Sequence, residues 1–235
     1  MLSRLLAMIR RPTPVAASGR QRPVAASGRR AIPLAEYQTA LRARLMVLSV
    51  RTQAAFAAAC AERLYPAYAA FMEASGRDDH GLVRRSLDLA WDGATSGAVP
   101  VADPAGLFEQ CVALISGDGS ALGTIPPHAD DAISSAAYAL QAAAGLDDAA
   151  AGWAAERATN SLDDFLRSSE IDDVADWEAD RRVWEHPLVA AEVARREDDL
   201  RRLADSSDWG AAVDAVRRAA AGVSALPLDR LNHET

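Results

Sequence analysis

Apolar residues recur every three or four positions through most of the chain after residue 33, which is the spacing of one buried helix face. The longest such stretch lies between Ser49, a typical N-cap residue, and Gly76, a typical C-terminal residue. Because its apolar face keeps its register beyond Pro66, we expect the proline to kink the helix rather than end it. This face consists of Ala57, Cys60, Ala61, Leu64, Tyr68, Phe71 and Met72.

Shorter stretches with the same period predict further helices joined by short connections. Expected N-caps are Asp78 or Asp79, Asp103, Asp147, and Ser206 or Ser207. No segment alternates apolar and polar residues as a half-buried strand does. The sequence therefore predicts an all-α fold, a compact bundle of about seven to eight helices. Their expected ranges are 34–48, 49–76, 78–92, 103–115, 126–144, 147–165, 186–203 and 206–220, with a short helix that holds Trp177 and Trp184.

The composition supports this interpretation and removes several enzyme classes. Half of the 235 residues are hydrophobic and alanine is abundant, whereas aromatic residues make up only 6 %, a balance that favours helices over strands. All 25 basic residues are arginine, and the sequence contains no lysine. Phosphate-binding loops, Schiff-base enzymes and Ser-x-x-Lys hydrolases all require a lysine. These three classes are therefore excluded. Cys60 and Cys111 stand in apolar helical contexts and are expected to be buried free thiols.

The first 33 residues differ from the rest, because the heptapeptide PVAASGR occurs twice, at 14–20 and 23–29. Proline, glycine and a shortage of large apolar side chains predict a disordered basic arm over residues 1–33. Three interpretations stay open: a short in-frame duplication, a start codon assigned too far upstream, or an arm that docks on phosphate or on acidic protein through its arginines.

Charge is unevenly distributed between this arm and the rest of the chain. The formal net charge is −8, and residues 1–30 contain seven arginines and no acidic residue. Removing these seven positive charges leaves −15 on residues 31–235. Such an acidic body repels nucleic acid and anionic membranes and attracts basic partners. No stretch of the sequence is long and apolar enough to span a membrane.

Five stretches carry a family resemblance: QAAFAAACAERLYPAYAAFMEASG, LVRRSLDLAWDG, DDAISSAAYAL, WAAERATNSLDDF and HPLVAAEVARREDDLRRL. They occur in order between residues 34 and 222 and resemble the YjaG family of uncharacterised bacterial proteins, a domain-of-unknown-function family. The resemblance implies a compact all-α domain, here residues 34–226, in the bacterial cytoplasm, and it brings no established catalytic residues. The basic arm and the ending VSALPLDRLNHET depart from the family, and residues 227–235 are expected to form a flexible tail.

Metal and phosphate sites are weakly indicated. The four histidines belong to no Glu-x-x-His or His-Glu-x-x-His motif. His128 with Asp130 and Asp131 offers a candidate ligand set, but acids in a first helical turn commonly complement the helix dipole. GDGSALG, residues 117–123, is interpreted as a helix end and turn rather than a phosphate loop. We therefore expect no metal and no cofactor.

Two acidic pairs, Asp163–Asp164 and Asp172–Asp173, are candidates for acid–base chemistry. Because the chain is rich in acids and no pocket is identifiable, a solvated surface is the favoured interpretation. The block RREDDLRR, residues 195–202, alternates in sign and predicts intrahelical ion pairs on an exposed helix face.

A second candidate segment runs from Trp177 to His186. Trp177 and Trp184 stand in an acidic, poorly periodic connection, and Glu185 and His186 follow them. Two interpretations stay open: the two rings fold down as core anchors, or they form an exposed binding patch, since tryptophan is enriched at interface hot spots.

These observations predict a non-catalytic protein-interaction module of the cytoplasm, whose acidic helical surface binds a basic protein partner rather than nucleic acid or membrane. One concrete form is an immunity (antitoxin-like) protein that covers the cationic site of a nuclease. The alternative is a small-molecule enzyme that uses carboxylates in an inter-helical pocket. No catalytic residue is assigned. The candidate partner-binding residues are Trp177, Trp184, Glu185, His186, Asp163, Asp164, Asp172 and Asp173.

Overall fold

The computed structural model describes residues 34–115, 125–171 and 174–231. These residues form ten helices and no strand, so the all-α prediction is confirmed and the expected count of seven to eight helices is too low. The arm of residues 1–33 and the GDGSALG segment lie outside the described residues, and what the sequence predicts for both stays a prediction. The helices are α2 (Leu34–Leu45), α3 (Val50–Ser75), α4 (Leu82–Ser96), α5 (Pro104–Ile115), α6 (Pro127–Ala143), α7 (Ala150–Ser169), α8 (Asp176–Glu185), α9 (Pro187–Ala204), α10 (Trp209–Ala221) and α11 (Leu228–Leu231).

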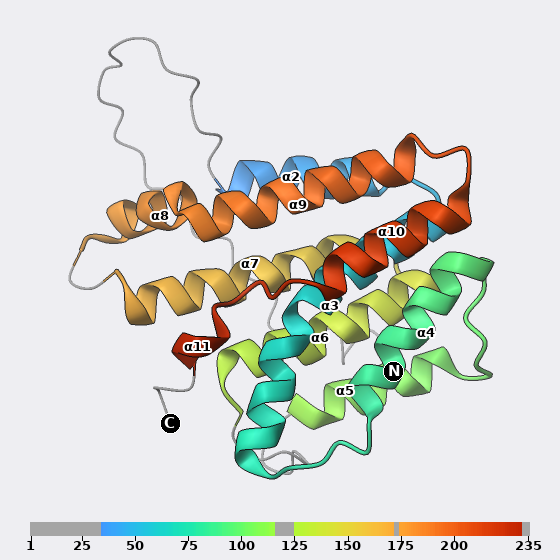
Figure 1. Ribbon diagram of the computed structural model, residues 1–235, viewed down its shortest axis with the longest axis horizontal. Helices are drawn as coiled ribbons and strands as arrows, with labels where there is room; N and C mark the ends of the chain where they lie inside the picture. The colour runs from blue at the N-terminus through green and yellow to red at the C-terminus, as the bar shows by residue number, and fades with distance from the viewer. Residues whose placement is uncertain (1–33, 116–124, 172–173, 232–235) are drawn as a thin grey trace. The chain divides into compact units, whose positions relative to one another are not determined.

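Helices α3 and α6 form the centre of the bundle (Figure 1). Helix α6 is buried along almost its whole length, and its buried face is largely alanine, as the sequence predicts. Small side chains at a contact let two helix backbones approach closely. Gly93 of α4 shows how close the approach is, because a Cβ added there would lie 3.0 Å from the Cβ of Ala143 in α6. Substituting a larger residue on this face would push the helices apart.

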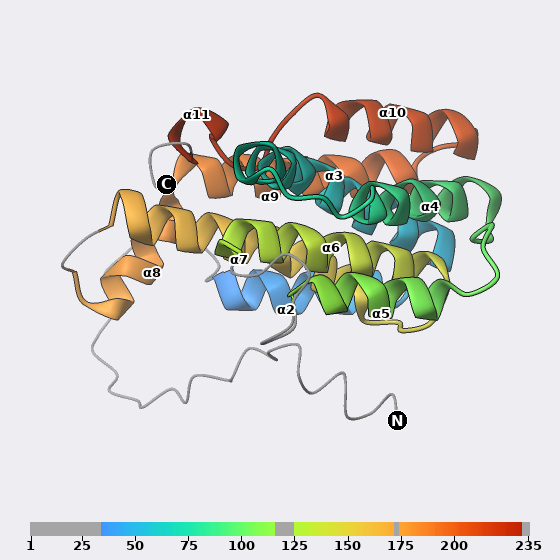
Figure 2. The same ribbon diagram turned by 90° about the horizontal axis from the view of Figure 1, so that it is seen from below.

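The other helices pack around this central pair. Helices α4, α5 and α7 contact α6, whereas α9 and α10 contact α3. Figure 2 shows α10 on one side of the α3–α6 pair and α2 and α5 on the other. Helix α2 buries Leu41 and Leu45, and two of its arginines form ion pairs with neighbouring helices. Arg42 pairs with Glu156 of α7, and the guanidinium of Arg44 lies 2.8 Å from a carboxylate oxygen of α9.

Helix boundaries follow the predicted signals at several positions. The Ser49 hydroxyl accepts a hydrogen bond from the N–H of Thr52, and Gly76 ends α3 with a φ of 63°. Helix α3 continues through Pro66, as expected. The Asp103 carboxylate accepts from the N–H of Gly106 at 2.8 Å, at the start of α5. These contacts satisfy N–H groups that a helix terminus otherwise leaves without partners.

Three expected caps differ from the structure. Ala149 rather than Asp147 occupies the N-cap of α7, although the Asp147 carboxylate accepts from the N–H of Ala149 at 2.8 Å. Gly81 rather than an aspartate occupies the N-cap of α4, although the Asp79 carboxylate still accepts from two backbone N–H groups there, at 3.0 and 2.9 Å. Asp208 rather than Ser206 or Ser207 caps α10. The difference arises because a short polar side chain just outside a helix reaches the first N–H groups from more than one position.

The last described segment is ordered more than the sequence suggests. Residues 228–231 lie within the stretch assigned to a flexible tail, and they form the one-turn helix α11. Its Leu231 is buried in a cluster with Leu166 of α7, Val183 of α8 and Val189 of α9. The hydrophobic pattern misses α11 because four residues are too few to display a helical period. Among the helices that the structure describes, none has the length and apolar character needed to cross a membrane.

Candidate functional site

Helix α8 carries the two tryptophans of the predicted interaction segment and lies where α7 ends and α9 begins (Figure 1). Ala179 and Val183, four residues apart, fix the inner face of this helix. Trp184 packs half-buried against the same apolar cluster, and its ring centroid is 6.0 Å from that of Tyr37 in α2. Trp177, by contrast, is 68 % exposed. The structure therefore divides the pair into one core anchor, Trp184, and one exposed ring, Trp177.

The remaining three tryptophans are all engaged in the bundle. Trp91 and Trp209 each donate an indole N–H hydrogen bond of 2.9 Å, and Trp153 lies beneath an arginine guanidinium 4.5 Å from its ring centroid. Within the described part of the chain, Trp177 has no hydrogen bond, ring contact or cation–π contact through its indole. Trp177 thus differs from every other tryptophan in that most of its surface is exposed to solvent.

The Asp163–Asp164 pair lies on α7 and is connected to α8 through an arginine. Arg167 pairs with Asp163 at 2.7 Å and also with Asp180 of α8. Asp164 makes no ion pair with any residue that the structure describes. Partial burial, followed by the neighbouring Asp163 carboxylate, raises the pKa of Asp164. Asp164 therefore has no ion-pair partner among the described residues, and the nearby Arg167 offsets these two effects on its pKa only in part.

Glu185 and His186 have structural partners. The Glu185 carboxylate lies 2.9 Å from the guanidinium of Arg181. His186 caps α9, because its Nδ1 accepts from the N–H of Leu188 at 3.2 Å. An accepting Nδ1 leaves the proton on Nε2, which lies 3.1 Å from a carboxylate oxygen of Glu170. His186 thus links the start of α9 to the end of α7, whereas the Glu185 pair lies within α8.

Of the eight predicted residues, Trp177 is exposed and Asp164 makes no ion pair with any described residue, whereas Asp172 and Asp173 lie outside the described residues. Between 163 and 185, the described residues include seven carboxylates and only three arginines. We define the α8 surface as Asp164, Asp176, Trp177 and Asp180. It combines one large apolar ring with excess negative charge.

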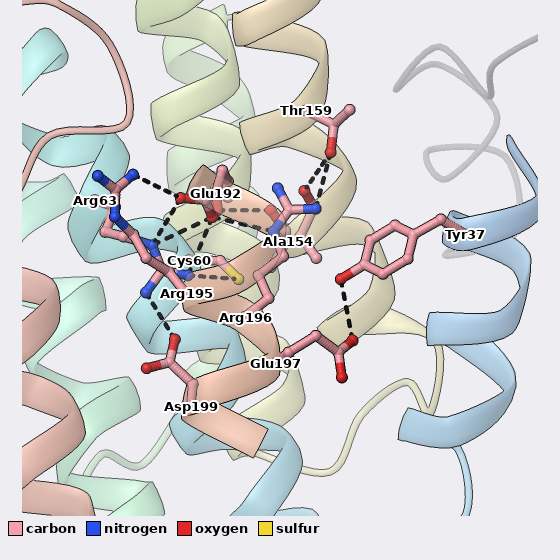
Figure 3. Close-up of polar contacts among 12 residues, drawn as sticks. Tyr37, Cys60, Arg63, Ala154, Thr159, Glu192, Arg195, Arg196, Glu197 and Asp199 are labelled. Carbon is pink, nitrogen blue, oxygen red and sulfur yellow. Dashed lines mark hydrogen bonds and ion pairs between the residues drawn. The ribbon is translucent and has the colours of Figure 1, made fainter. Parts of the chain in front are cut away.

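A second polar site was missed by the sequence: four charged side chains buried between α3 and α9, here called the buried charge cluster (Figure 3). The Glu192 carboxylate accepts from the Nε of Arg63 at 3.1 Å and from the Nε of Arg196 at 3.0 Å. Asp199 accepts from the Nη1 of Arg63 at 2.7 Å. The Nη1 of Arg196 also donates to the hydroxyl of Thr159 at 2.9 Å. Two positive and two negative groups thus compensate one another inside the bundle.

The buried charge cluster corrects the prediction that residues 195–202 form an exposed face. Arg196 and Asp199 are buried, although Asp198 does form the expected surface pairs with Arg201 and Arg202. The signal was present in the spacing, because Glu192, Arg196 and Asp199 fall at the i, i+4 and i+7 positions of one helix face. Because these three residues are charged, the sequence predicts an exposed face, whereas the face points into the bundle.

Burial controls ionisation in this cluster. Loss of water opposes the charge of Glu192, yet the guanidinium groups of Arg63 and Arg196 hold its pKa below the usual value. Burial also raises the pKa of Asp199, only partly offset by Arg63. Since none of these groups reaches solvent, the buried charge cluster stabilises a packing arrangement and does not contact a substrate.

The two cysteines are free and buried, as the sequence predicts. Burial raises the pKa of Cys60 to about 11 and likewise that of Cys111 to about 11. A thiol with so high a pKa holds almost no thiolate near neutral pH. Neither cysteine is poised to act as a nucleophile.

The candidate metal ligands are not brought together. Asp131 turns toward α7, where Arg157 and the hydroxyl of Ser161 approach its carboxylate at 3.3 and 3.1 Å. Asp130 accepts instead from Ser134. In the described ranges, no group of three or more His, Cys, Asp or Glu side chains is arranged to hold a metal ion.

A hollow of about 490 Å³ lies elsewhere, at the turn from α3 to α4 and the C-terminal half of α5. Its volume falls within the range of small-molecule sites. Of the carboxylate pairs singled out in the sequence, the described pair Asp163–Asp164 does not line it. Its lining consists of Asp78, Asp79, His80, Leu82, Arg85, Gln110, Ala113 and Leu114.

Comparison with known proteins places this arrangement in a family. Residues 40–226 match the family described as "Protein of unknown function (DUF416)". The crystal structure of a DUF416 family protein from Shewanella baltica OS155 is similar to this chain with a TM-score of 0.64 and 17 % sequence identity. The similarity covers 78 % of this chain and 95 % of that one, and at this identity it supports the fold alone. No curated protein matches the sequence.

Proposed function

The chain belongs to the DUF416 family, and from this premise we propose that it is a non-catalytic protein-interaction module that binds a basic protein through the α8 surface. Within the family, the five sequence stretches quoted above favour the YjaG proteins of the bacterial cytoplasm. The observation that carries the proposal is the exposure of Trp177 on α8, where the adjacent Asp176 and the α7 residue Asp164 make no ion pair with any described residue.

An exposed tryptophan on an ordered helix calls for an explanation. Large aromatic side chains are usually buried to a high degree, and those left exposed concentrate at binding sites. Exposure is not the rule for tryptophan in this fold, because the other four are hydrogen-bonded or packed against another side chain. A partner that covers Trp177 would remove its indole from water and would gain the largest apolar contact that this face offers.

Charge indicates the chemistry of that partner. Asp164 has a raised pKa partly because the Asp163 carboxylate is adjacent, so the two negative charges oppose each other in the free protein. A lysine or arginine from a partner would relieve this repulsion. The −15 charge on residues 31–235 would also accelerate the encounter with a basic protein at low salt. An immunity protein that covers the cationic site of a nuclease is the concrete form we favour.

The test compares three variants of the full-length chain as bait in a bacterial lysate. We expect the unmodified chain to capture a protein of high isoelectric point at low salt and to release it as salt rises. Trp177→Ala and Asp164→Asn should each reduce capture about tenfold or more. Leu146→Ala is the matched control, because Leu146 is also a large exposed apolar residue, at 49 %, outside the α8 surface. Equal capture by all variants, or a salt-insensitive acidic partner, would contradict the proposal.

The hollow beside His80 favours a second candidate, a small-molecule enzyme with carboxylates in an inter-helical pocket. The Nδ1 of His80 lies 3.0 Å from the Asp78 carboxylate, which is the arrangement that orients an imidazole as a general base. Screening hydrolase substrates against the unmodified chain and His80→Asn tests it. Turnover that disappears in His80→Asn would favour this candidate over the interaction module.

A further inference from the structure

The carboxylates that line the hollow at the α3–α4 turn have partners, whereas the arginine that lines it has none among the described residues. Both of its carboxylates already have partners within the turn. Asp79 accepts from the N–H groups of Gly81 and Val83, at 3.0 and 2.9 Å. Asp78 accepts from the backbone N–H of His80 at 2.6 Å and pairs with the imidazole of the same residue. Both carboxylates of the hollow therefore form hydrogen bonds that stabilise the turn.

The positively charged residue that lines the hollow is Arg85, and its side chain has no partner among the described residues. Arg85 is one turn into α4 and exposed, and it makes no hydrogen bond or ion pair with any residue that the structure describes. Its neighbour Arg84, by contrast, pairs with Glu62 at 2.7 Å and with Asp88 at 2.9 Å. An arginine that faces a hollow without a carboxylate offers its planar donors to an anion.

His80 adds a second donor when its imidazole is protonated on both nitrogens, and its backbone conformation is unusual. With Nδ1 directed to Asp78, its Nε2 has no partner among the described residues. His80 is also the one non-glycine residue of the described chain with a positive φ, 54°. This conformation is disfavoured for residues with a side chain, and such positions concentrate at functional sites. A glycine would fit the same backbone without strain.

A buried hydroxyl, that of Tyr68, is coupled to one carboxylate of the hollow. Tyr68 is only 2 % exposed, and its hydroxyl makes no hydrogen bond of ordinary geometry in the described part of the chain. Burial, and after it the Asp79 carboxylate that lines the hollow, raises the pKa of Tyr68. Two polar groups that line the hollow thus have no partner among the described residues: the Arg85 guanidinium and the His80 Nε2.

We propose that this hollow binds a small molecule with a carboxylate or phosphate group, which the Arg85 guanidinium and the His80 imidazolium hold. Because Nδ1 donates to Asp78, Nε2 carries a proton, and donates to the anion, only in the doubly protonated imidazolium form. Leu82, Ala113 and Leu114 provide an apolar wall for the rest of the molecule. The site is separate from the α8 surface, so it stands or falls independently of the protein-interaction module.

Histidine NMR signals of the full-length protein provide the test, with titrations of inorganic phosphate and of acetate at constant ionic strength. The His80 signal is identified by its absence in His80→Asn. We expect it to shift in a saturable way, with a dissociation constant on the order of millimolar for the better anion. The anion that saturates at lower concentration decides between phosphate and carboxylate. A His80 signal that saturates with neither anion would overturn the proposal.

Two variants assign the roles of the residues. Arg85→Gln should weaken binding about tenfold or more, because it removes a charge-assisted contact. Arg218→Gln is the matched control, since Arg218 is another exposed arginine without a partner among the described residues and does not line the hollow. Unchanged affinity in Arg85→Gln would refute the proposal.

His80→Gly separates ligand binding from maintenance of the turn. Glycine accepts the positive φ, so the melting temperature should stay the same or rise. Anion affinity, measured by calorimetry or through the amide signals of the α3–α4 turn, should nevertheless fall. If affinity is retained in His80→Gly, His80 is not a ligand and the proposed site is wrong.

Discussion

Arg63 of α3 and Asp199 of α9 form an ion pair of 2.7 Å although their side chains are only 1 % and 5 % exposed. Removing two such charges from water costs several kcal/mol, which mutual attraction offsets only when further hydrogen bonds are present. Glu192 and Arg196 supply those bonds. The four charges therefore fix the position of α9 on α3, because any sliding of one helix would leave a charge without its partner.

Breaking the pair from one side should destabilise the protein strongly. Asp199→Ala leaves the Nη1 of Arg63 buried without an acceptor, and we expect the free energy of unfolding to fall by about 3 kcal/mol. Denaturant unfolding followed by circular dichroism measures the change. Asp198→Ala is the control one position away, because Asp198 pairs with Arg201 and Arg202 at the surface. It should cost less than about 1 kcal/mol. Similar losses in both variants would show that the buried pair has no special role.

Truncation of the two tryptophans of α8 should change stability by very different amounts. Trp184→Ala removes a ring that packs against the apolar cluster and Tyr37, and we expect a loss of about 2 kcal/mol in the free energy of unfolding. Trp177→Ala removes an exposed ring and should change stability by no more than about 0.5 kcal/mol. Thermal unfolding of the two variants gives the comparison. A large loss in Trp177→Ala would mean that its ring supports the fold and is not reserved for a partner.

Periodicity accounts for most of what the sequence predicts about the fold. Leucine, alanine and valine at helical spacing identify α3, α6 and α9, and Ser49 and Gly76 mark the ends of α3. The sequence does not predict helix α11, because four residues are too few to show a helical period. The helix is explained only by the tertiary structure, in which Leu231 packs into the apolar cluster.

Sites were harder to predict than helices, since exposure depends on which elements meet. The sequence singles out Trp177 and Trp184 as one segment, but only the path of α2 decides that Tyr37 covers Trp184 and leaves Trp177 exposed. Arg196 and Asp199 were assigned to the surface because charge outweighed helical spacing in the interpretation of residues 195–202. The Asp78–His80 contact depends on a positive φ that no local pattern announces.

Both thiols should resist modification in the folded protein. Cys60 and Cys111 are buried, and burial raises the pKa of each to about 11, so both access and thiolate are lacking. We expect a disulfide reagent such as dithionitrobenzoate to react with neither thiol at pH 8 on the timescale of minutes. Two thiols per chain should react rapidly once denaturant unfolds the protein. Rapid reaction of one thiol under native conditions would indicate local opening of the helix that carries it.

Asp131 should make stability depend on pH in a direction opposite to that of an ordinary surface carboxylate. Burial raises its pKa from 3.8 to about 7; the facing Arg157 and Ser161 of α7 lower it only in part, and Asp130 raises it further. Between about pH 4 and pH 7 the folded protein therefore holds a proton on Asp131 that the unfolded chain has released. Stability contributed by this group is full below pH 4, falls as pH rises toward 7 and is then constant.

The measurement is the free energy of unfolding of the full chain and of Asp131→Asn at intervals from pH 4 to pH 8. Asparagine keeps the shape and can accept from Ser161 but does not titrate, so the variant should lose less stability across this interval than the unmodified chain, by at least about 1 kcal/mol. Asp130→Asn is the control, because Asp130 is adjacent, accepts from Ser134 and has a more exposed carboxylate. Parallel pH profiles for the unmodified chain and Asp131→Asn would show that Arg157 compensates the buried charge fully, and that Asp131 stays ionised throughout this range.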